Sequence, residues 1–157
     1  MSINKLLTKT KIAIIDLDNC ISDDAWRLHM FELHKQDVDA RYRNYHQHCG
    51  YDEIGNVHTL KAILRRYQIY IFTARPEQYR ALTEKWLAFH GVDYKKLFMR
   101  GNDDHRCSVE VKRDMLNALP NKQDVVFAID DRSDILAMYA DEGIKMCMRV
   151  FINNIKE

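Results

Sequence analysis

Three short apolar runs that end abruptly in polar residues constrain the fold of this chain more than any other feature. They cover residues 11–15, 69–72 and 125–129. Runs of this length, rich in β-branched and aromatic residues, are typical of parallel strands buried on both faces. Two shorter stretches, residues 97–100 and 145–151, are further strand candidates. The pattern therefore predicts a sheet whose central strands are covered on both sides.

The stretches between these runs carry apolar residues at helical spacing. They are Leu60, Ile63, Leu64 and Tyr67 in one stretch and Leu82, Trp86 and Phe89 in another. We interpret Trp86 and Phe89 as core or helix-packing residues. Strands that alternate with helices predict right-handed crossovers and a mainly parallel sheet with helices on both faces. The predicted fold class is α/β, a Rossmann-like three-layer sandwich, in which ligands bind beyond the carboxyl ends of the strands.

The length of 157 residues suits a single domain, residues 1–157. Residues 22–58 separate the first apolar run from the next helix and are rich in His, Tyr, Arg and Asp. A structureless loop of this length is uncommon inside a compact domain. We therefore expect a small helical cap insertion, at about residues 22–58, that covers the site.

The charge balance and the cysteine content indicate which partners and which cellular compartment to expect. Lys and Arg total 24 and Asp and Glu total 23, so the formal net charge is +1. This balance provides no general attraction to nucleic acid or to an anionic membrane, and affinity for a phosphorylated ligand must arise locally. The four cysteines include no Cys-x-x-Cys pair, which favours reduced thiols in the cytoplasm. No window approaches about 20 apolar residues, so we expect a soluble, unexported protein with no membrane partner.

The first apolar run delivers two carboxylates, Asp16 and Asp18, separated by one residue. If extended geometry continues, both project to the same side. Hydrolysis of a phosphate monoester needs a nucleophile and a proton for the leaving oxygen. Proximity separates the pKa values of two carboxyls, so one can stay ionised as the nucleophile while the other holds a proton to donate. The alternative is a strand that simply ends in polar residues, because Asp-x-Asp is frequent by chance.

A second acidic pair, Asp130 and Asp131, follows the third apolar run, with Asp134 three residues later. Converging carboxylates repel one another unless a hard cation is shared among them. Mg²⁺ is the usual oxygen-liganded cation beside a phosphate. Capping of the helix that follows is the alternative role for the pair, and it is compatible with metal binding.

Cationic and hydroxyl groups complete the candidate site. Thr73 and Arg75 follow the second apolar run and offer a hydroxyl, a backbone N–H and a guanidinium, which suit phosphoryl oxygens. Lys112 could bring an ammonium group from the start of a helix. The alternatives are that Thr73 caps a helix before Pro76 and that Lys112 is a solvated surface lysine.

These residues, in this order, resemble the four motifs of the haloacid dehalogenase-like (HAD) phosphatase superfamily over nearly the whole chain. The motifs are Asp16-x-Asp18, Thr73-Ala74-Arg75, Lys112 and Asp130-Asp131-x-x-Asp134. A closer resemblance is to the 3′-phosphatase half of phage polynucleotide kinases and their small stand-alone relatives. The segments that carry it are Ile129-Asp130-Asp131-Arg132, Leu97-Phe98-Met99-Arg100 with Asp104-His105-Arg106, Lys112 and Gly143-Ile144-Lys145.

The resemblance implies a two-step reaction at the first motif. Asp16 would attack phosphorus and become an aspartyl-phosphate, while Asp18 would protonate the leaving oxygen and later activate water. Asp16, the backbone carbonyl of Asp18 and Asp130 would hold Mg²⁺, with Asp131 supporting the cluster. The residues placed at the substrate phosphate are Thr73, Ala74, Arg75, Lys112 and Arg27.

The resemblance also implies the class of substrate, a phosphorylated small molecule such as a nucleotide or a nucleic-acid end. A nucleoside monophosphate and a 3′-phosphorylated end both fit, and a phage-encoded chain would act in the host cytoplasm. The family's Gly-Thr after the second Asp is Asn19-Cys20 here, its Gly in the second motif is Ala74, and an acidic residue before the lysine is Ser108. Asn tolerates a left-handed backbone, so we expect the turn to persist. The departures also motivate an alternative, a nucleotide-binding or regulatory protein with impaired catalysis.

The cap segment holds further candidates. His46, His48, Cys49 and His58 suggest zinc, but their spacing fits no common structural site, and we favour a polar cap surface. Tyr42, Tyr45, His46 and Tyr51, with Arg41 and Arg43, are candidates to stack on a base and contact its backbone. Packing of these aromatic residues between cap and sheet is the alternative. The sequence does not indicate an oligomeric state.

Overall fold

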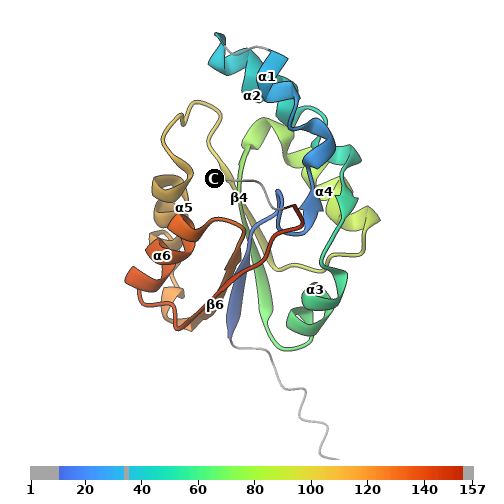
Figure 1. The fold of residues 1–157 in the computed structure, drawn as a ribbon. Helices are drawn as coiled ribbons and strands as arrows, with labels where there is room; N and C mark the ends of the chain where they lie inside the picture. Colours follow the sequence, from blue (N-terminus) through green and yellow to red (C-terminus); the bar gives the residue numbers. More distant parts are fainter. Residues whose placement is uncertain (1–10, 34–35, 154–157) are drawn as a thin grey trace, which may run out of the picture.

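The computed structural model describes residues 11–33 and 36–153, and a parallel sheet lies at its centre (Figure 1). The strands of this sheet are β1 (Ile12–Ile15), β4 (Gln68–Pro76), β5 (Lys96–Arg100), β6 (Val125–Asp130) and β7 (Met146–Arg149). Within the described residues their order is β5-β4-β1-β6-β7, and every neighbouring pair is parallel. The prediction of an α/β fold with a mainly parallel sheet is confirmed.

Helices cover both faces of the sheet (Figure 1). They are α3 (Val57–Leu64) and α4 (Arg80–Phe89) on one face and α5 (Ser108–Asn117) and α6 (Ser133–Asp141) on the other. Successive residues of β1 point to opposite faces, so Ile12 and Ile14 pack with Leu116 of α5, whereas Ala13 and Ile15 pack with Leu87 of α4. The central strand is therefore buried on both sides, as its continuous apolar run predicts.

The order of the strands reverses at β1. From β1 the chain builds β4 and β5 on one side and then crosses over to build β6 and β7 on the other. The carboxyl ends of β1 and β6 are therefore neighbours at the reversal, where sheets of this kind bind their ligands. The three polar strand ends do converge at one edge, as expected.

Strand β4 is longer than the sequence pattern indicates. It continues from Phe72 through Thr73 and Arg75 to Pro76, with a register shift against β5 before Pro76 pairs with Arg100. Thr73 is therefore a strand residue, and the alternative that it caps a helix is wrong. The last residues of β4 are polar because this end of the strand borders the site, whereas its earlier residues pack in the core.

The segment between β1 and α3 forms short helices and a two-stranded ribbon. Its elements are β2 (Ser22–Asp23), η1 (Ala25–Arg27), α1 (Met30–Leu33), α2 (Val38–His46), η2 (Cys49–Tyr51) and β3 (Glu53–Ile54). Strands β2 and β3 pair antiparallel, and the Asp37 side chain caps α2 by accepting the Ala40 N–H at 2.9 Å. Helices α1 and α2 lie beyond the carboxyl ends of the strands (Figure 1). Two further 3₁₀ turns, η3 (Glu77–Tyr79) and η4 (Lys122–Asp124), precede α4 and β6.

One residue of α4 does not lie where the helical spacing predicts. Phe89 is 83% exposed, so its assignment to the core is wrong, whereas Trp86 on the same helix is buried. Phe89 is the last residue of α4, and no core residues lie opposite it there.

Among the helices of the described residues, none has both the length and the apolar character needed to cross a membrane.

The contrast within α4 provides a stability prediction. We expect Leu87→Ala to lower the free energy of unfolding by about 2 to 5 kcal/mol, because it empties a fully buried site. Phe89→Ala is the matched control on the same helix and should change it by no more than about 0.5 kcal/mol. Urea unfolding followed by circular dichroism measures both. Equal losses for the two variants would contradict this packing.

Candidate active site

Three carboxylates meet where β1 and β6 end. The Asp16 N–H donates to the Ile129 carbonyl at 3.0 Å, which joins the two strand ends. Asp16 and Asp130 are buried and Asp131 is half-buried. One carboxylate oxygen from each of Asp16, Asp130 and Asp131 lies within 4.8 Å of the others. Such a group of hard oxygen donors fits a divalent cation, and Mg²⁺ in particular.

Lys112 brings positive charge to the same place from the first turns of α5. Its ammonium nitrogen is 2.7 Å from Asp16 Oδ1 and 2.7 Å from Asp130 Oδ2. Only 1% of the residue is exposed, so the alternative of a solvated surface lysine is wrong. An ammonium group between two buried carboxylates offsets part of their repulsion.

Burial controls the pKa values of these acids. It raises the pKa of Asp16 to about 7, with Lys112 opposing the rise and Asp130 adding to it. Burial, together with the charge of Asp16, raises the pKa of Asp131 to about 6. A bound divalent cation would favour the ionised form of each carboxyl, since it supplies the charge that Lys112 alone cannot.

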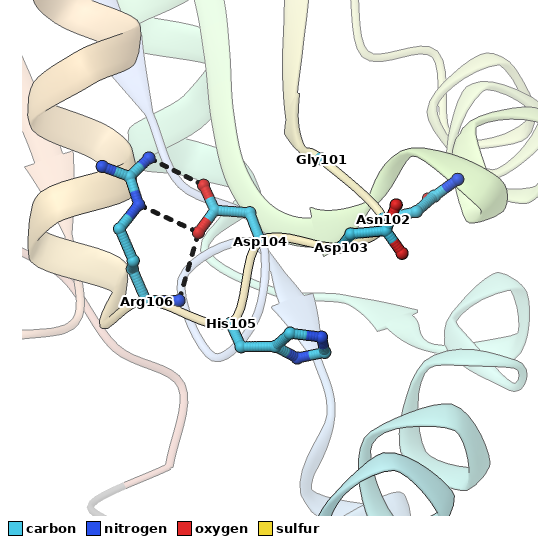
Figure 2. A pocket seen from close by; sticks show the side chains of 6 residues that line it. All are labelled: Gly101, Asn102, Asp103, Asp104, His105 and Arg106. Carbon is cyan, nitrogen blue, oxygen red and sulfur yellow. Dashed lines mark hydrogen bonds and ion pairs between the residues drawn. The ribbon is translucent and has the colours of Figure 1, made fainter.

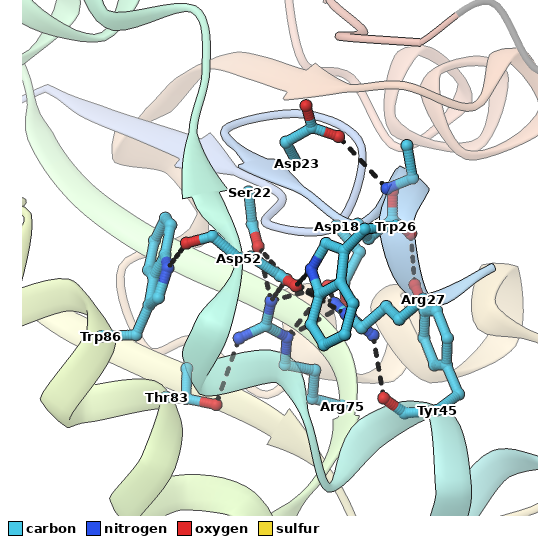
Figure 3. Close-up of polar contacts among 12 residues, drawn as sticks. Asp18, Ser22, Asp23, Trp26, Arg27, Tyr45, Asp52, Arg75, Thr83 and Trp86 are labelled. Carbon is cyan, nitrogen blue, oxygen red and sulfur yellow. Dashed lines mark hydrogen bonds and ion pairs between the residues drawn. The ribbon is translucent and has the colours of Figure 1, made fainter. Parts of the chain in front are cut away.

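Asp18 belongs to a second network, shown in Figure 3, and its carboxylate lies outside the three-carboxylate group. It accepts hydrogen bonds from Arg27 at 2.5 Å and from Arg75 at 2.6 Å. Burial alone would raise the pKa of Asp18, but the guanidinium groups of Arg75 and Arg27 outweigh it and hold this pKa well below its usual range. The pKa values of Asp16 and Asp18 are separated, as expected, but Asp18 is the more acidic because it alone faces two guanidiniums.

Asp52, which follows η2, balances the charge of the two arginines. Its carboxylate accepts hydrogen bonds from Arg27 at 2.6 and 2.7 Å and from Arg75 at 3.2 Å. Ser22 and Trp26 also donate to it, at 2.5 and 3.0 Å (Figure 3). The four charged residues therefore form one cluster, Asp18–Arg27–Asp52–Arg75, in which all but the half-buried Asp18 are buried and positive and negative groups are equal in number. We refer to it below as the arginine cluster.

Aromatic residues of the segment between β1 and α3 pack against the arginine cluster. The Arg27 guanidinium carbon lies 3.9 Å from the centre of the Tyr45 ring, and the Tyr45 hydroxyl donates to Asp24. His46 is buried, its Nδ1 has no hydrogen-bond partner among the described residues, and burial lowers its pKa to about 3. Tyr45 and His46 therefore have the packing role, whereas Tyr42 and Tyr51 are exposed.

The remaining predicted residues line the edge formed by β4 and β5. Thr73 is fully buried, and its Oγ1 accepts the Arg75 N–H at 3.2 Å. The Ala74 carbonyl accepts from Arg100 Nε at 3.0 Å. After Arg100, residues 101–106 line an open hollow of about 700 Å³ (Figure 2). His105 of this loop approaches Asp39 of α2, with 3.9 Å between Nδ1 and Oδ1, so the loop and α2 border the same edge.

The structure thus brings the predicted residues together in two groups. Asp16, Lys112, Asp130 and Asp131 form one, and Asp18, Arg27 and Arg75 belong to the other. Sequence reasoning missed Asp52 and Ser22, which have no motif spacing and lie far along the chain from Arg75. One signal could have pointed to Asp52: a buried pair of arginines needs a second carboxylate for charge balance.

Comparisons with known proteins identify a family and a fold that this chain shares. The family model described as the polynucleotide kinase PNKP phosphatase domain matches residues 10–154. A chain of the Pnkp1/Rnl/Hen1 RNA repair complex superposes with a TM-score of 0.71 and 25% sequence identity, over 95% of this chain and 45% of that one. This chain therefore spans less than half of that relative. Comparison with curated protein sequences finds no match.

More distant structures share the fold. A haloacid dehalogenase-like hydrolase from Streptococcus pneumoniae has a TM-score of 0.58 at 12% identity, covering 89% of this chain and 84% of its own. The HAD hydrolase YfnB from Bacillus subtilis, bound to magnesium, has a TM-score of 0.58 at 14% identity and covers 87% of each chain.

The arginine cluster predicts a large effect for Asp52→Asn. The variant leaves two buried guanidiniums with one carboxylate, so the free energy of unfolding should fall by about 3 kcal/mol or more. The control is Glu84→Gln, which removes an exposed partner of Arg80 and should cost no more than about 1 kcal/mol. Chemical unfolding of both proteins is the measurement. If Asp52→Asn costs as little stability as the control, Asp52 does not balance the charge of the two buried arginines.

The raised pKa values predict the pH dependence of stability without metal. Asp16, Asp24 and Asp131 have pKa values raised from 3.8 to about 7, 6 and 6, mainly by burial. Between pH 4 and 7 the folded state then holds more protons on these groups than the unfolded state, so stability falls as pH rises. His46, whose pKa is lowered, opposes this in part.

Unfolding in a chelator at several pH values tests the expectation. The fall in stability with rising pH should be smaller in Asp131→Asn, which has no titratable carboxyl at this position. Saturating Mg²⁺ should also reduce it, because the cation binds the ionised carboxylates. A metal-free protein that becomes steadily more stable from pH 5 to 7 would contradict the assignment.

Proposed function

Since this chain belongs to the polynucleotide kinase phosphatase domain family of HAD-like phosphatases, we propose that it is a Mg²⁺-dependent phosphomonoesterase that hydrolyses a nucleotide phosphate. The observation that carries the proposal is the position of Lys112 between Asp16 and Asp130, beside Asp131. In this proposal these groups act as a nucleophile, a cation site and a source of positive charge at one buried strand end. A surface helix cap or a chance Asp-x-Asp would not need them together.

Asp16 is the proposed nucleophile. Its oxygen forms a bond to phosphorus while the bond from phosphorus to the ester oxygen breaks, which leaves an aspartyl-phosphate. Lys112 contacts Asp16 and stays close to the phosphoryl oxygens as their charge changes. Asp16, the backbone carbonyl of Asp18 and Asp130 would hold Mg²⁺, with Asp131 in support, and the cation would supply further positive charge to those oxygens.

Asp18 is the proposed general acid and base. The two guanidiniums hold it as a carboxylate, the form that accepts a proton from water when the aspartyl-phosphate is hydrolysed. Donation to the leaving oxygen in the first step requires Asp18 to gain a proton from the solvent beforehand. An approaching phosphate dianion favours that gain, because its negative charge opposes the guanidiniums.

The other predicted residues surround the phosphate in this proposal. The Thr73 hydroxyl and the Ala74 backbone lie at the end of β4 and are proposed to bind phosphoryl oxygens together with Lys112. Arg27 and Arg75 act on the phosphate from beside Asp18, through their charge.

A nucleotide is the proposed substrate, as a nucleoside monophosphate or as the 3′-phosphorylated end of a nucleic acid. The family match supports it, as does the likeness to a chain of an RNA repair complex. Residues 22–58 are the proposed cap, and the exposed Tyr42 of α2 and the hollow beside residues 101–106 are the proposed place for the nucleoside. A cytoplasmic setting is part of the same proposal.

The alternative function is nucleotide binding or regulation without turnover, motivated by Asn19-Cys20. Asn19 adopts φ 57°, so the left-handed turn is present without glycine. Cys20 is fully buried and packs in the core with Leu17 and Ile21. Neither replacement displaces the carboxylates, and we therefore favour the enzyme.

Phosphate release tests the proposal. With Mg²⁺, the wild-type protein should release inorganic phosphate from at least one class in a panel of nucleoside 5′-monophosphates, 3′-monophosphates and 3′-phosphorylated oligonucleotides. Asp16→Asn should lower kcat by at least about three orders of magnitude, because no nucleophile remains. Glu84→Gln is the control and should keep wild-type activity. Full turnover by Asp16→Asn would refute the mechanism, and tight binding without turnover by the wild type would favour the alternative.

A further inference from the structure

Asn19, the residue after Asp18, occupies a backbone position that glycine would adopt at lower cost. Its φ is 57°, in the left-handed region, and its N–H donates to the Ser22 carbonyl at 2.9 Å to close the turn after β1. The residue is only 5% exposed. A buried amide in a conformation that disfavours side chains needs compensating contacts.

The Asn19 amide has these contacts, and they reach distant parts of the chain. Its Nδ2 donates to Asp131 Oδ2 at 3.0 Å and to the Asn153 carbonyl at 3.2 Å. Its Oδ1 accepts the Asn153 N–H at 2.8 Å. The Asn153 N–H requires an acceptor, so this bond determines which end of the amide faces Asp131.

The segment after β7, residues 150–153, is held along the same edge. Val150 N–H donates to the Asp130 carbonyl at 3.1 Å, and Ile152 N–H donates to the Asn19 carbonyl at 2.8 Å. The Asn153 side chain donates to Asp23 Oδ1 at 2.7 Å. The Ile152 side chain also lies so close to Gly55 that a Cβ there would be 2.3 Å from it. The post-β7 segment therefore joins the β1 turn, the end of β6 and the β2–β3 ribbon.

We infer that Asn19 is a positioning residue: its amide orients the Asp131 carboxylate for cation binding and anchors the post-β7 segment to the turn after β1. The inference rests on the proposed function, since it concerns the same Mg²⁺ site. Glycine at this position would keep the turn but could make none of the three side-chain hydrogen bonds. Residues that hydrogen-bond to a metal-binding carboxylate and orient it affect the affinity of the site for its metal ion.

Asn19→Gly tests the inference by a measurement that does not depend on catalysis. Isothermal titration calorimetry with Mg²⁺ should show binding about tenfold or more weaker than in the wild-type protein. In an Asp131→Ala background the same substitution should have little further effect on Mg²⁺ affinity, because its partner is already absent. Wild-type affinity in Asn19→Gly would overturn the inference.

Asn153→Ala is the matched control. It removes the hydrogen bond to Asp23 but keeps the backbone N–H and carbonyl that hold the Asn19 amide, so Mg²⁺ affinity should not change. If Asn19→Gly does not fold, a chain that ends after Phe151 provides the test. This chain lacks the Asn153 partners of Asn19 and should bind Mg²⁺ more weakly than the wild type, and unchanged binding would overturn the inference.

The two proposals fail in different ways. A wild-type protein that neither binds Mg²⁺ nor releases phosphate would overturn the proposed function and this inference together. A wild-type protein that does both, with an Asn19→Gly variant of equal Mg²⁺ affinity, would overturn the inference alone.

Discussion

The arginine cluster is the interaction on which the arrangement of the sheet and the segment between β1 and α3 depends. Arg75 comes from β4 and Asp18 follows β1, whereas Arg27 and Asp52 come from the insertion. Buried ions lose their hydration, and only close pairing with good geometry compensates for that loss. Each member therefore has to meet its partners, which determines where the insertion sits above the strand ends. Tyr45 of α2 then packs over Arg27, so the orientation of this segment and the environment of Asp18 have one cause.

Two carboxyls separated by one residue lie in opposite environments, because Asp18 belongs to the arginine cluster and Asp16 to the group of three carboxylates. Asp16 lies among carboxylates with a single ammonium group, and its pKa rises, whereas Asp18 lies between two guanidiniums, and its pKa falls. The proposed reaction needs Asp16 ionised and Asp18 protonated when the ester bond breaks. A cation at the three carboxylates and a phosphate dianion beside Asp18 would move each group in that direction. In the proposed reaction, binding of these two ligands would therefore change the charge of both carboxyls.

Most of the fold could be predicted from the chain, because strand and helix patterns are local. The apolar runs match β1, β4 and β6, and the carboxylates after them do meet. The extension of β4 through Arg75 escaped prediction because its last residues are polar and face the site rather than the core. Phe89 was misplaced because helical spacing alone does not show where the neighbouring core ends.

The sequence by itself determined the alternation of strands and helices, the motif residues and the family they resemble, because each depends on neighbouring residues or fixed spacing. Only the tertiary structure decided which distant groups became partners. Asp52 pairs with Arg27 and Arg75, and Asn19 contacts Asp131 and Asn153, 112 and 134 residues away. Such pairings follow from charge balance and hydrogen bonding in a buried site, where an unpaired charge is costly whatever its position in the chain.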